Sequence, residues 1–534
     1  MIKSYIEQMK NITSAELVEG LVGHGLFSNK IPPFLSSEYF FNFCKNIELP
    51  TDSNSKFMNQ NHRKDSNFIQ YENIRNINIP RILAIPEPVA YYNLCQCLAD
   101  NWDNLCSHFE KYSGAEKYKR SRIHIRKIQD KKQIFIMNDY FDEEVFIQLT
   151  EKIKPNIFDL SYRNIKEDGN PIPKILIGKK YLVNADISNC FNSIYTHAFS
   201  WALVGKEKAK NERSGRWHNE IDKYAMNLTN GETHGILIGP HASNLLSEII
   251  LVVIDKMLCE KEYDYIRNID DYSCYVESRE QAEQFLIDLS NGLKEYGLSL
   301  NHKKTKIQPL PLAISEHWVR KLNKSVPNNR FFDYKMVQVF LDTAIELMSQ
   351  HQENSAILNY AIKTLSGKKL SKSANKYYIE MIHHLVLLYP YLIQLLDEFI
   401  FEPFQTGLEH IKKISNDIYE IGYKNNSYEA IGYALFFSIK YNFKLKDTLF
   451  DELQYSQDAV ALLLGYMHDK KFWGLHSKKT KEYKKLAKSL YLDDADKFWI
   501  FTYEVLTIGN FKKNSDWYNM KQKNISFLLP EFRS

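Results

Sequence analysis

The sequence predicts an α+β domain over residues 1–325 and an all-α domain of HEAT-like helical repeats over residues 326–534. Between about residues 80 and 325, strand-like and helical runs alternate, with turn signals at Asn230-Gly231 and Gly239-Pro240. The segment before about residue 80 is expected to be a helical extension of this domain. After residue 325 glycine becomes rare and amphipathic helical runs follow one another, which is typical of stacked helix pairs, although the runs show no clean period.

The helical half is predicted from apolar residues that recur every three to four positions. The clearest runs lie at residues 332–349, 356–365, 377–399, 408–423, 428–443, 459–466 and 497–509. Short polar loops separate them, so we place the boundary between the two domains near residue 325.

The composition indicates a folded chain with large cores, because 44% of the residues are hydrophobic and 25% are charged. The net charge of +4 is small, so a surface for nucleic acid has to come from local clusters of basic residues. No run reaches the ~18 uninterrupted apolar residues of a membrane span, and the N-terminus has no apolar signal core. We therefore expect a cytoplasmic protein that has no membrane partner.

The seven cysteines are an odd number scattered through apolar stretches, which favours buried thiols in a reducing compartment. Cys95, Cys97, Cys106 and His108 can be combined into a zinc-binding set. They fall in a helical-looking run at residues 91–112, so we favour their burial in a core.

Three aspartates stand where strands are predicted to end. An apolar, β-prone run from Tyr181 ends at Asp186. Further along, two β-rich arms flank Asp270 and Asp271, which predicts a hairpin with both aspartates at its turn. Adjacent carboxylates repel each other, so this turn favours a bound cation. Taken alone, each feature has an ordinary explanation: a solvated turn for the Asp-Asp pair and a helix cap for Asp186.

The chemistry that suits such carboxylates is phosphoryl transfer from a nucleoside triphosphate. Two divalent metal ions ~3.5–4 Å apart activate the attacking hydroxyl and neutralise the leaving pyrophosphate. Hard Mg²⁺ is held by carboxylates that converge from rigid strands. We therefore predict that Asp186, Asp270 and Asp271 are catalytic residues and metal ligands, with Mg²⁺, or Mn²⁺ in its place, as the cofactor.

A glycine-containing loop lies between the two aspartate sites. Gly235 and Gly239 let the backbone approach a ligand closely, and Pro240 suits the first turn of a helix. A core-facing helical pattern follows, so the junction can contact an incoming nucleotide through Gly239, Pro240 and Ser243. An ordinary turn before a core helix is the alternative.

Two basic stretches are candidates for contacts with phosphate. Lys304 lies in the lysine-rich end of a predicted strand and can donate a proton to the leaving pyrophosphate. Residues 117–132 have few acids and a strand-like alternation whose basic face suits a triphosphate or a template backbone. The predicted contacts in this second stretch are Arg122 and Arg126 to the nucleotide, and Lys119, Arg120 and Lys127 to nucleic acid. A solvated charge run is the alternative in both cases.

Taken in order, these pieces resemble the palm and fingers of reverse transcriptases. Asp186 with Phe191 is similar to motif A, residues 235–243 to motif B, residues 269–271 to motif C and residues 300–304 to motif D. More narrowly, four stretches resemble the prokaryotic abortive-infection and defence-associated reverse transcriptases of the AbiK and AbiA type. They are ADISNCFNSIYTHAFSWALVGK, GILIGPHASNLLSEIIL, IFIMNDYF (134–141) and HWVRKLN (317–323). The resemblance covers residues 80–325 by motif and the C-terminal half only in its helical character.

The resemblance implies a fingers–palm domain followed by a helical-repeat domain in place of a conventional thumb. It implies an RNA-directed DNA polymerase, a nucleotidyltransferase, that uses dNTPs in antiphage defence and forms a homo-oligomer such as a trimer or hexamer. Some members extend DNA without a template and attach it to their own protein, and others copy a partner non-coding RNA. The resemblance also adds the backbone carbonyl of Ile187 to the metal ligands and assigns Phe191 to the ring that excludes a ribose 2′-OH.

The sequence departs from this pattern at Asn268, because an aromatic residue usually precedes the x-Asp-Asp of motif C. A conventional thumb or primer-grip motif is also absent from the sequence. Both departures favour unusual priming, for which a Tyr hydroxyl is one candidate.

Two other hypotheses stay open. One is a catalytically silent scaffold whose helical half binds RNA or phage protein through Lys478 and Lys481, which belong to a basic stripe over residues 478–488. A solvated helix face is the ordinary alternative for that stripe. The other is a retron- or intron-type reverse transcriptase or an RNA-dependent RNA polymerase, which Phe191 and the helical half disfavour.

Overall fold

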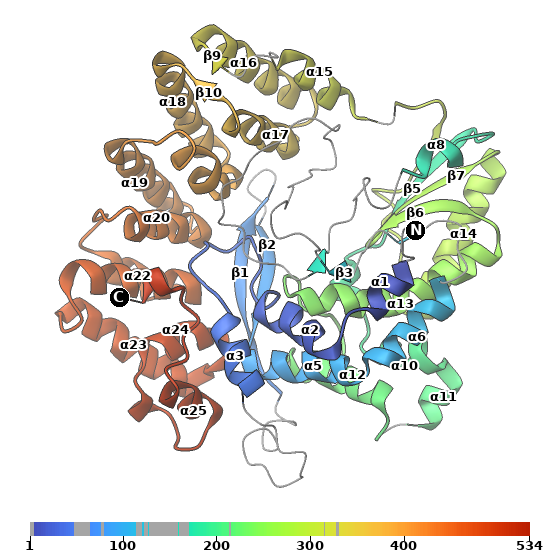
Figure 1. Ribbon diagram of the computed structural model, residues 1–534, viewed down its shortest axis with the longest axis horizontal. Helices are drawn as coiled ribbons and strands as arrows, with labels where there is room; N and C mark the ends of the chain where they lie inside the picture. The colour runs from blue at the N-terminus through green and yellow to red at the C-terminus, as the bar shows by residue number, and fades with distance from the viewer. Residues whose placement is uncertain are drawn as a thin grey trace.

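The computed structural model describes residues 5–46, 65–75, 80–113, 120–121, 126–127, 158–159, 170–212, 215–313, 315–326 and 331–533. In Figure 1 the C-terminal helices form an arc on the left, and a small sheet with its helices lies on the right. The strands β1 (Phe68–Ile74) and β2 (Pro80–Pro86) stand between these two parts. The predicted α+β domain followed by a helical C-terminal region is confirmed.

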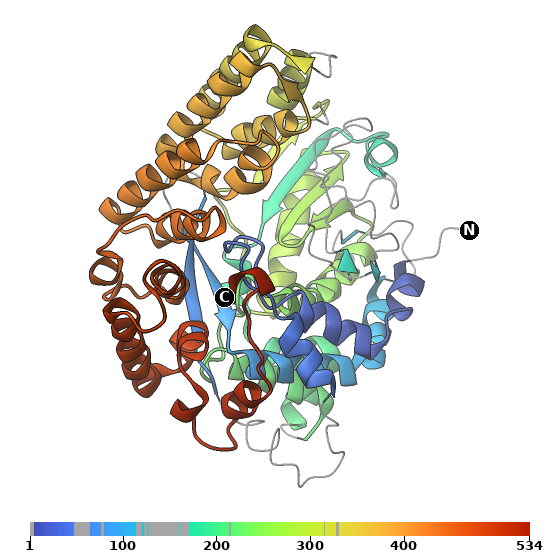
Figure 2. The same cartoon turned by 60° about the vertical axis from the view of Figure 1, so that its left-hand side comes forward.

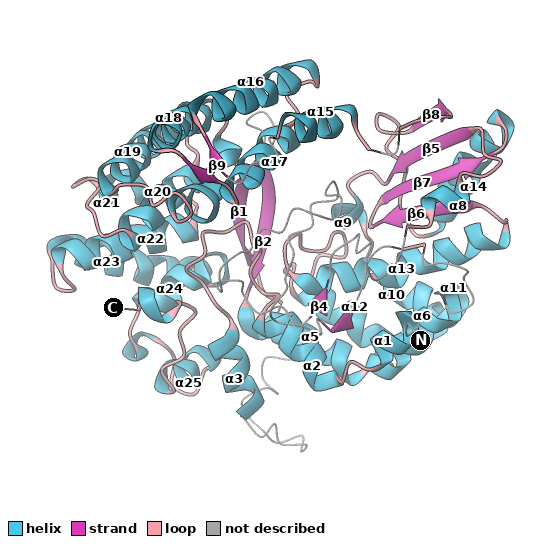
Figure 3. Cartoon of the chain, turned by 45° about the horizontal axis from the view of Figure 1, so that its top comes forward, coloured by secondary structure: helices cyan, strands magenta, loops and turns pink. Residues whose placement is uncertain are grey.

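Four strands form the sheet that carries the predicted aspartates: β5 (Tyr181–Asp186), β6 (Asp264–Asn268), β7 (Asp271–Val276) and β8 (Lys306–Pro309). Their order is β6-β7-β5-β8, and every neighbouring pair is antiparallel. The strands lie side by side in Figure 3, with helices next to them.

Alternate strand residues point to opposite faces of the sheet, and helices cover the apolar side chains on these faces. Tyr272, Cys274 and Val276 of β7 belong to the main core. On that side α14 (Arg279–Glu295) packs against β5 and β7, and α13 (His241–Glu260) packs against α14. On the other face Ile266 and Tyr275 form a small cluster with Ile175.

The remaining described N-terminal elements are mostly helices, which support the sheet and the loop before α13. They include α1 (Tyr5–Lys10), α2 (Ser14–Val18), α3 (Glu38–Asn46), α5 (Pro88–Asp100), α6 (Trp102–Ser113), α8 (Ile172–Ile175), α9 (Cys190–Ser193), α10 (His197–Val204), α11 (Lys206–Asn211) and α12 (Trp217–Asn227). Two short strands, β3 (Arg126–Lys127) and β4 (Phe158–Asp159), pair antiparallel. α6 and α13 pack against each other, so the helices beneath the sheet form one core with it.

The C-terminal helices follow one another along the arc in Figure 1. They are α15 (His317–Ser325), α16 (Tyr334–Gln350), α17 (Ser355–Ser366), α18 (Lys372–Leu388), α19 (Leu408–Lys424), α20 (Tyr428–Lys440), α21 (Leu449–Leu453), α22 (Ala459–Trp473), α23 (Lys478–Asp494), α24 (Trp499–Val505) and α25 (Asp516–Gln522). Two short strands, β9 (Phe331–Phe332) and β10 (Lys369–Leu370), pair between them.

The single helix expected at residues 377–399 is interrupted. α18 ends at Leu388, a 3₁₀ helix runs over Pro390–Leu395, and a π-helical turn follows at Asp397–Phe401. Pro390 explains the break, because proline has no N–H to continue the α-helical hydrogen bonds and its ring clashes with the preceding turn. The boundary predicted near residue 325 stays a prediction, and α15, which precedes it, packs against α16 and α17.

The far end of the helical half returns to the N-terminal segment. The Ser36 N–H donates to the Phe527 carbonyl at 2.7 Å, and the Leu529 N–H donates to the Phe34 carbonyl at 2.9 Å. In Figure 2 the C-terminal segment lies next to the N-terminal segment that precedes α3. Phe527 is fully buried, with its ring centroid 5.5 Å from that of Phe40 and 4.8 Å from that of Trp499.

The C-terminal helices also hold the β1–β2 hairpin. The Glu429 carboxylate of α20 accepts hydrogen bonds from the Ile74 N–H and the Asn73 amide of β1. At the end of β2, the Ile85 carbonyl accepts from the Trp499 indole at 3.3 Å. The hairpin is therefore clamped by residues more than three hundred positions away in the sequence. None of the helices in the described ranges combines the length and the hydropathy that a membrane span requires.

Candidate active site

The three predicted aspartates lie at one end of the sheet. Asp186 is the last residue of β5 and is paired in register with Asp271, the first residue of β7. Asn268 and Asp271 face each other across the β6–β7 hairpin, so Ile269 and Asp270 form its two-residue turn. The Ile187 N–H donates to the Asp270 carbonyl at 3.1 Å, which ties the end of β5 to this turn. The hairpin expected from the sequence is thus present, but only Asp270 lies in the turn, because Asp271 is already paired as the first residue of β7.

The carboxylate of Asp186 is buried, with 5% of the residue exposed, and both of its oxygens have partners. Lys304 Nζ lies 2.8 Å from Oδ2, and the Asn301 amide donates to Oδ1 at 2.9 Å. The Asn301 N–H also donates to the Asp186 carbonyl at 2.8 Å. The segment that contains Lys304 is therefore fastened to the end of β5.

Burial and the neighbouring charges raise the pKa of Asp270 and of Asp271. Burial raises the pKa of Asp270, and the charge of Asp186 adds to this shift, whereas Lys304 and Arg81 oppose it. Although Asp271 lies at an exposed strand end, the protein packed around its carboxyl and the charges of Asp270 and Asp186 raise its pKa to about 6. The hydrogen bond to Asp186 raises the pKa of Lys304. The site therefore holds more negative charge than its one close ammonium compensates.

This donor set fits a hard divalent cation in its chemistry, because carboxylate oxygens are the ligands that Mg²⁺ prefers and because a cation would relieve the repulsion. The fit is incomplete in its geometry. Among the described residues, no group of three or more His, Cys, Asp or Glu side chains is drawn together closely enough to hold a metal ion. Asp186 instead bonds Lys304 and Asn301, so binding of a metal there requires the Lys304 ammonium to leave the carboxylate.

The loop before α13 is joined to the segment that contains Phe191. The Ile236 N–H donates to the Phe191 carbonyl at 2.8 Å, and the Gly235 N–H donates to the Ile194 carbonyl at 2.8 Å. The Phe191 side chain is largely buried, with 9% of the residue exposed. These hydrogen bonds fasten the loop to the segment that contains Phe191.

Gly239 brings this loop against the β1–β2 hairpin. It has φ 127°, and a Cβ built on it would lie 3.2 Å from the Ala84 carbonyl oxygen. The Ala84 N–H donates to the Ile238 carbonyl at 2.8 Å. Pro240 is the N-cap of α13, and Ser243 is buried in its first turn. The absence of a side chain at Gly239 thus permits the close contact with β2.

The basic stretch is described only in part. Lys119 and Arg122 lie outside the described residues, as do the side chains of Arg126 and Lys127 and the whole of residues 134–141. Arg120 is described and lies beside β6: its carbonyl accepts from the Arg267 N–H at 2.8 Å. Its guanidinium donates to the Tyr263 carbonyl and lies over the Tyr265 ring, 4.9 Å from the ring centroid.

Two residues near the aspartates were not predicted from the sequence. Asn301 shares the Asp186 carboxylate with Lys304, and its place three residues before Lys304 is the only local signal for it. Arg81 of β2 acts electrostatically on Asp270, although 189 positions separate the two residues in the sequence. No local pattern could have found Arg81. Asn268, which stands where reverse transcriptases usually have an aromatic residue, has a buried side-chain oxygen with no hydrogen-bond partner among the described residues.

The cysteines considered as zinc ligands are buried in helices. Cys95 and Cys97 lie in α5 and Cys106 in α6, and burial raises the pKa of each thiol. His108 Nε2 lies 2.8 Å from the Ile249 carbonyl of α13, and burial lowers the pKa of its ring to about 4. His108 therefore joins α6 to α13 as an uncharged ring.

Lys478 and Lys481 lie on the solvent side of α23. Lys485 and Lys488 are exposed on the same face of this helix, since the spacing of the four lysines is three or four residues. The buried residues Thr480, Tyr483 and Ala487 lie on the opposite face. None of these four lysines forms an ion pair with a residue that the structure describes.

Comparison with known proteins supplies a family for part of the chain. Residues 143–314 match the family described as reverse transcriptase (RNA-dependent DNA polymerase). No curated protein matches the chain.

Telomerases are among the solved structures to which this chain is similar. Apo telomerase from Candida tropicalis is 11% identical, with 75% of this chain and 73% of that chain covered and a TM-score of 0.33. A C-terminally truncated form of it is 14% identical, with 47% and 51% covered and a TM-score of 0.30, so this chain spans about half its length. Telomerase from Candida albicans in complex with a fragment of telomeric RNA is 10% identical, with 73% and 67% covered and a TM-score of 0.26.

The family match includes β5, the loop before α13 and the β6–β7 hairpin with its two aspartates. The chain therefore contains a reverse transcriptase domain, the nucleotidyltransferase domain of RNA-directed DNA polymerases.

Proposed function

We propose that this chain synthesises DNA from dNTPs at the site formed by Asp186, Asp270 and Asp271. The observation that carries the proposal is the pairing of Asp186 with Asp271 at the ends of β5 and β7, with Asp270 in the adjoining turn, inside the matched domain. Asp186 and Asp270 bind two Mg²⁺ ions together with the Ile187 carbonyl, and Asp271 assists. When bound, the metal ions lower the pKa of the attacking hydroxyl and stabilise the pyrophosphate that leaves.

Lys304 has two successive roles in this proposal. Without substrate it neutralises Asp186, and its ammonium must move away before the carboxylate can bind a cation. Two-thirds of its side chain is exposed, so this movement meets little steric resistance. An ordinary lysine amine, with a pKa of about 10.4, stays protonated after it leaves Asp186, and it then donates that proton to the departing pyrophosphate.

The nucleotide contacts come from the elements around the aspartates. Phe191 excludes a ribose 2′-OH, which selects dNTPs. Gly239, Pro240 and Ser243 support the base and sugar from the start of α13, and Arg122 and Arg126 contact the triphosphate. Lys119, Arg120 and Lys127 contact the nucleic-acid backbone.

The partner nucleic acid is the DNA product and, in one form of the proposal, a non-coding RNA bound along α23. Lys478, Lys481, Lys485 and Lys488 form a one-sided stripe of exposed ammonium groups with no described carboxylate to pair them. Such a stripe suits a polyanion. Replacing Lys481 and Lys485 by alanine should reduce the slope of log affinity for RNA against log salt by about 0.7 for each lysine. An unchanged slope would contradict the assignment.

The test of the central proposal is nucleotide incorporation. Purified protein is incubated with Mg²⁺ and each labelled dNTP in turn, and the product is run on a denaturing gel before and after protease treatment. Wild type should incorporate label, and Asp270→Ala should fold but incorporate none. Substantial incorporation by Asp270→Ala would refute the site. Label that migrates with the protein until protease is added would indicate priming from a Tyr hydroxyl, and sequencing of co-purified RNA would identify a template.

The motif resemblance to abortive-infection enzymes supports a role in antiphage defence, in the cytoplasm and as a homo-oligomer. Phage should form fewer plaques on cells that express the wild-type protein than on cells that express Asp270→Ala. Equal plaque counts would contradict this role. Sedimentation of the purified protein tests whether it forms a trimer or hexamer.

A second candidate is a catalytically silent scaffold that binds RNA or protein. The observation that favours it is the engagement of both Asp186 oxygens by Lys304 and Asn301. The same incorporation assay separates the two, since a scaffold retains RNA but incorporates no dNTP.

A further inference from the structure

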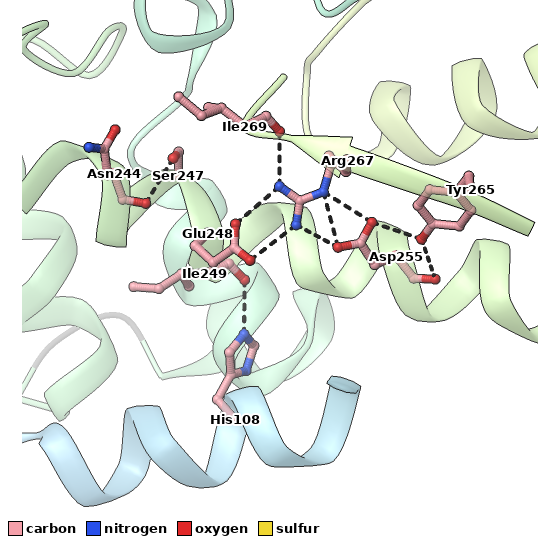
Figure 4. A network of polar contacts seen from close by, with 9 residues as sticks. All are labelled: His108, Asn244, Ser247, Glu248, Ile249, Asp255, Tyr265, Arg267 and Ile269. Atoms are coloured by element: carbon pink, nitrogen blue, oxygen red, sulfur yellow. Dashed lines mark hydrogen bonds and ion pairs between the residues drawn. The ribbon is translucent and has the colours of Figure 1, made fainter. Parts of the chain in front are cut away.

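Arg267 of β6 is wholly buried between the sheet and α13 (Figure 4). Its Nε and Nη2 donate to the Asp255 carboxylate, with Nε at 3.1 and 3.0 Å from the two oxygens. Nη1 and Nη2 also donate to the Glu248 carboxylate, at 3.0 and 3.2 Å. A single guanidinium therefore joins two acids that stand two helical turns apart on α13.

Burial of these charges is expensive unless each is paired and hydrogen-bonded. Burial alone would lower the pKa of Arg267, but Asp255 and Glu248 raise it well above its ordinary value. The Tyr265 hydroxyl donates to Asp255 Oδ1 at 2.8 Å and satisfies more of that carboxylate. Apolar residues of similar volume often stabilise a core as well as such a group does. Stability alone therefore gives little reason for an arginine here.

A further hydrogen bond of the Arg267 guanidinium reaches the turn that holds Asp270. Nη1 donates to the Ile269 carbonyl at 2.9 Å, as Figure 4 shows. Ile269 has φ 51°, a left-handed conformation that is unfavourable for a β-branched residue. The hydrogen bond from Arg267 helps to hold this strained residue in place.

Both peptide groups that flank Asp270 are thus fixed by hydrogen bonds. The carbonyl before it accepts from Arg267, and its own carbonyl accepts from the Ile187 N–H at 3.1 Å. Fixing both peptide planes fixes the direction in which the Asp270 side chain leaves the backbone. Because Ile187 follows Asp186, the second bond also sets the turn relative to the end of β5.

We propose that Arg267 is a positioning residue that holds Asp270 in the geometry needed to bind a divalent cation. This inference rests on the proposed function. Glu248 and Asp255 orient the guanidinium from α13, and the guanidinium orients the turn. A planar fork with several fixed donors is required, so lysine, which carries a single nitrogen, cannot replace arginine.

The test compares Arg267→Lys with two matched controls on the same network. Arg267→Lys keeps the charge but loses the fork. Tyr265→Phe removes the hydroxyl that contacts the carbonyl and the carboxylate of Asp255, and it leaves the contact of Arg267 with Ile269. His108→Phe removes the bond to the Ile249 carbonyl, which anchors the other side of α13, and leaves the turn untouched. Mn²⁺ binding is measured by electron paramagnetic resonance and calorimetry, dNTP incorporation by steady-state kinetics, and stability by thermal unfolding.

Arg267→Lys should weaken Mn²⁺ binding and lower kcat by about ten- to a hundredfold, as losses of outer-shell partners typically do. The KM for dNTP should stay within about twofold, because the nucleotide contacts are not altered. His108→Phe should lower the midpoint of thermal unfolding without changing the Mn²⁺ affinity, and Tyr265→Phe should have a smaller effect than Arg267→Lys.

Wild-type Mn²⁺ affinity in a folded Arg267→Lys protein would overturn the inference and leave the proposed function intact. Equal losses of Mn²⁺ affinity in Arg267→Lys and His108→Phe would also overturn it, because the effect would then follow from the general stability of α13. Wild-type protein that binds no Mn²⁺ and incorporates no dNTP would overturn the proposed function and this inference with it.

Discussion

Two regions of the molecule join distant residues by different means. One is the sheet that carries Asp186, and the other is the contact between β1–β2 and the C-terminal helices. Beside the sheet, buried carboxylates are paired with cations: Glu248 and Asp255 of α13 form ion pairs with Arg267 of β6. At the β1–β2 contact, Glu429 and Glu87 accept hydrogen bonds from uncharged N–H groups. Burial raises the pKa of both glutamates to about 7.

This difference separates two properties of the molecule. Paired charges with several fixed hydrogen bonds set directions, which suits a site whose carboxylates must point at one place. Aromatic packing and single buried carboxyl groups stabilise the contact between β1–β2 and the C-terminal helices. The contribution of the carboxyl groups depends on pH. Substitutions at the β1–β2 contact should therefore change stability and leave metal binding at the aspartates unaltered, and substitutions around Arg267 should do the reverse.

The largest effect is expected at the aromatic contact between the two chain ends. Phe527→Ala should reduce the free energy of unfolding by about 3–5 kcal/mol, because a fully buried ring is removed and a cavity remains. Denaturant unfolding measures this loss. Mn²⁺ affinity at 20 °C, about the usual temperature of maximum stability, should be unchanged. Phe331→Ala, at a ring with 57% of the residue exposed, is the control and should have little effect.

A smaller, pH-dependent effect is expected at Glu429. Its pKa is raised from 4.5 to about 7, so the folded state holds this proton more tightly than the unfolded state. The stabilisation is complete below about pH 4.5 and is lost as the pH rises through about 7, amounting to about 3 kcal/mol. Glu429→Gln cannot lose a proton. As the pH rises from 5 to 8, the unfolding temperature of wild type should therefore fall relative to that of Glu429→Gln, and thermal scans would measure this. A difference independent of pH would contradict a protonated Glu429.

The smallest effect is expected at Lys304, whose ammonium bonds the Asp186 carboxylate. Lys304→Met should tighten Mn²⁺ binding, because a competing cation is removed. The gain should be about 1 kcal/mol or less, up to about fivefold, because the lysine is mostly exposed. Calorimetry measures it, and kcat should fall because the proposed proton donor is lost. Lys303→Met is the matched control, and weaker Mn²⁺ binding in Lys304→Met would contradict the proposed competition.

Much of the sheet could be predicted because its signals are local. Asp186 ends a β-prone run and Asp270 and Asp271 sit between two others, so neighbouring residues alone place them at strand ends. α13 was equally visible from its apolar spacing. The ends of the elements were less accessible, as the break at Pro390 shows.

The contacts that complete the site could not be predicted, because their partners are far apart in the chain. Lys304 meets Asp186 across 118 positions, and the charge of Arg81 reaches Asp270 from a different strand pair. Arg267 is a single basic residue within a strand, and nothing near it in the sequence indicates that Glu248 and Asp255 will surround it. Such pairings follow from the tertiary fold, which the local pattern does not specify.

The bonds between residues 34–36 and 527–529 have a consequence for biosynthesis. A ribosome that adds about 5–20 residues per second needs between about 25 and 100 s to proceed from the first of these segments to the second. During that interval Phe34, Phe40 and the ends of β1–β2 lack the helices that later cover them. The nascent chain thus exposes aromatic surface for many times longer than a small domain needs to fold, and a chaperone that shields this surface should raise the yield of native protein.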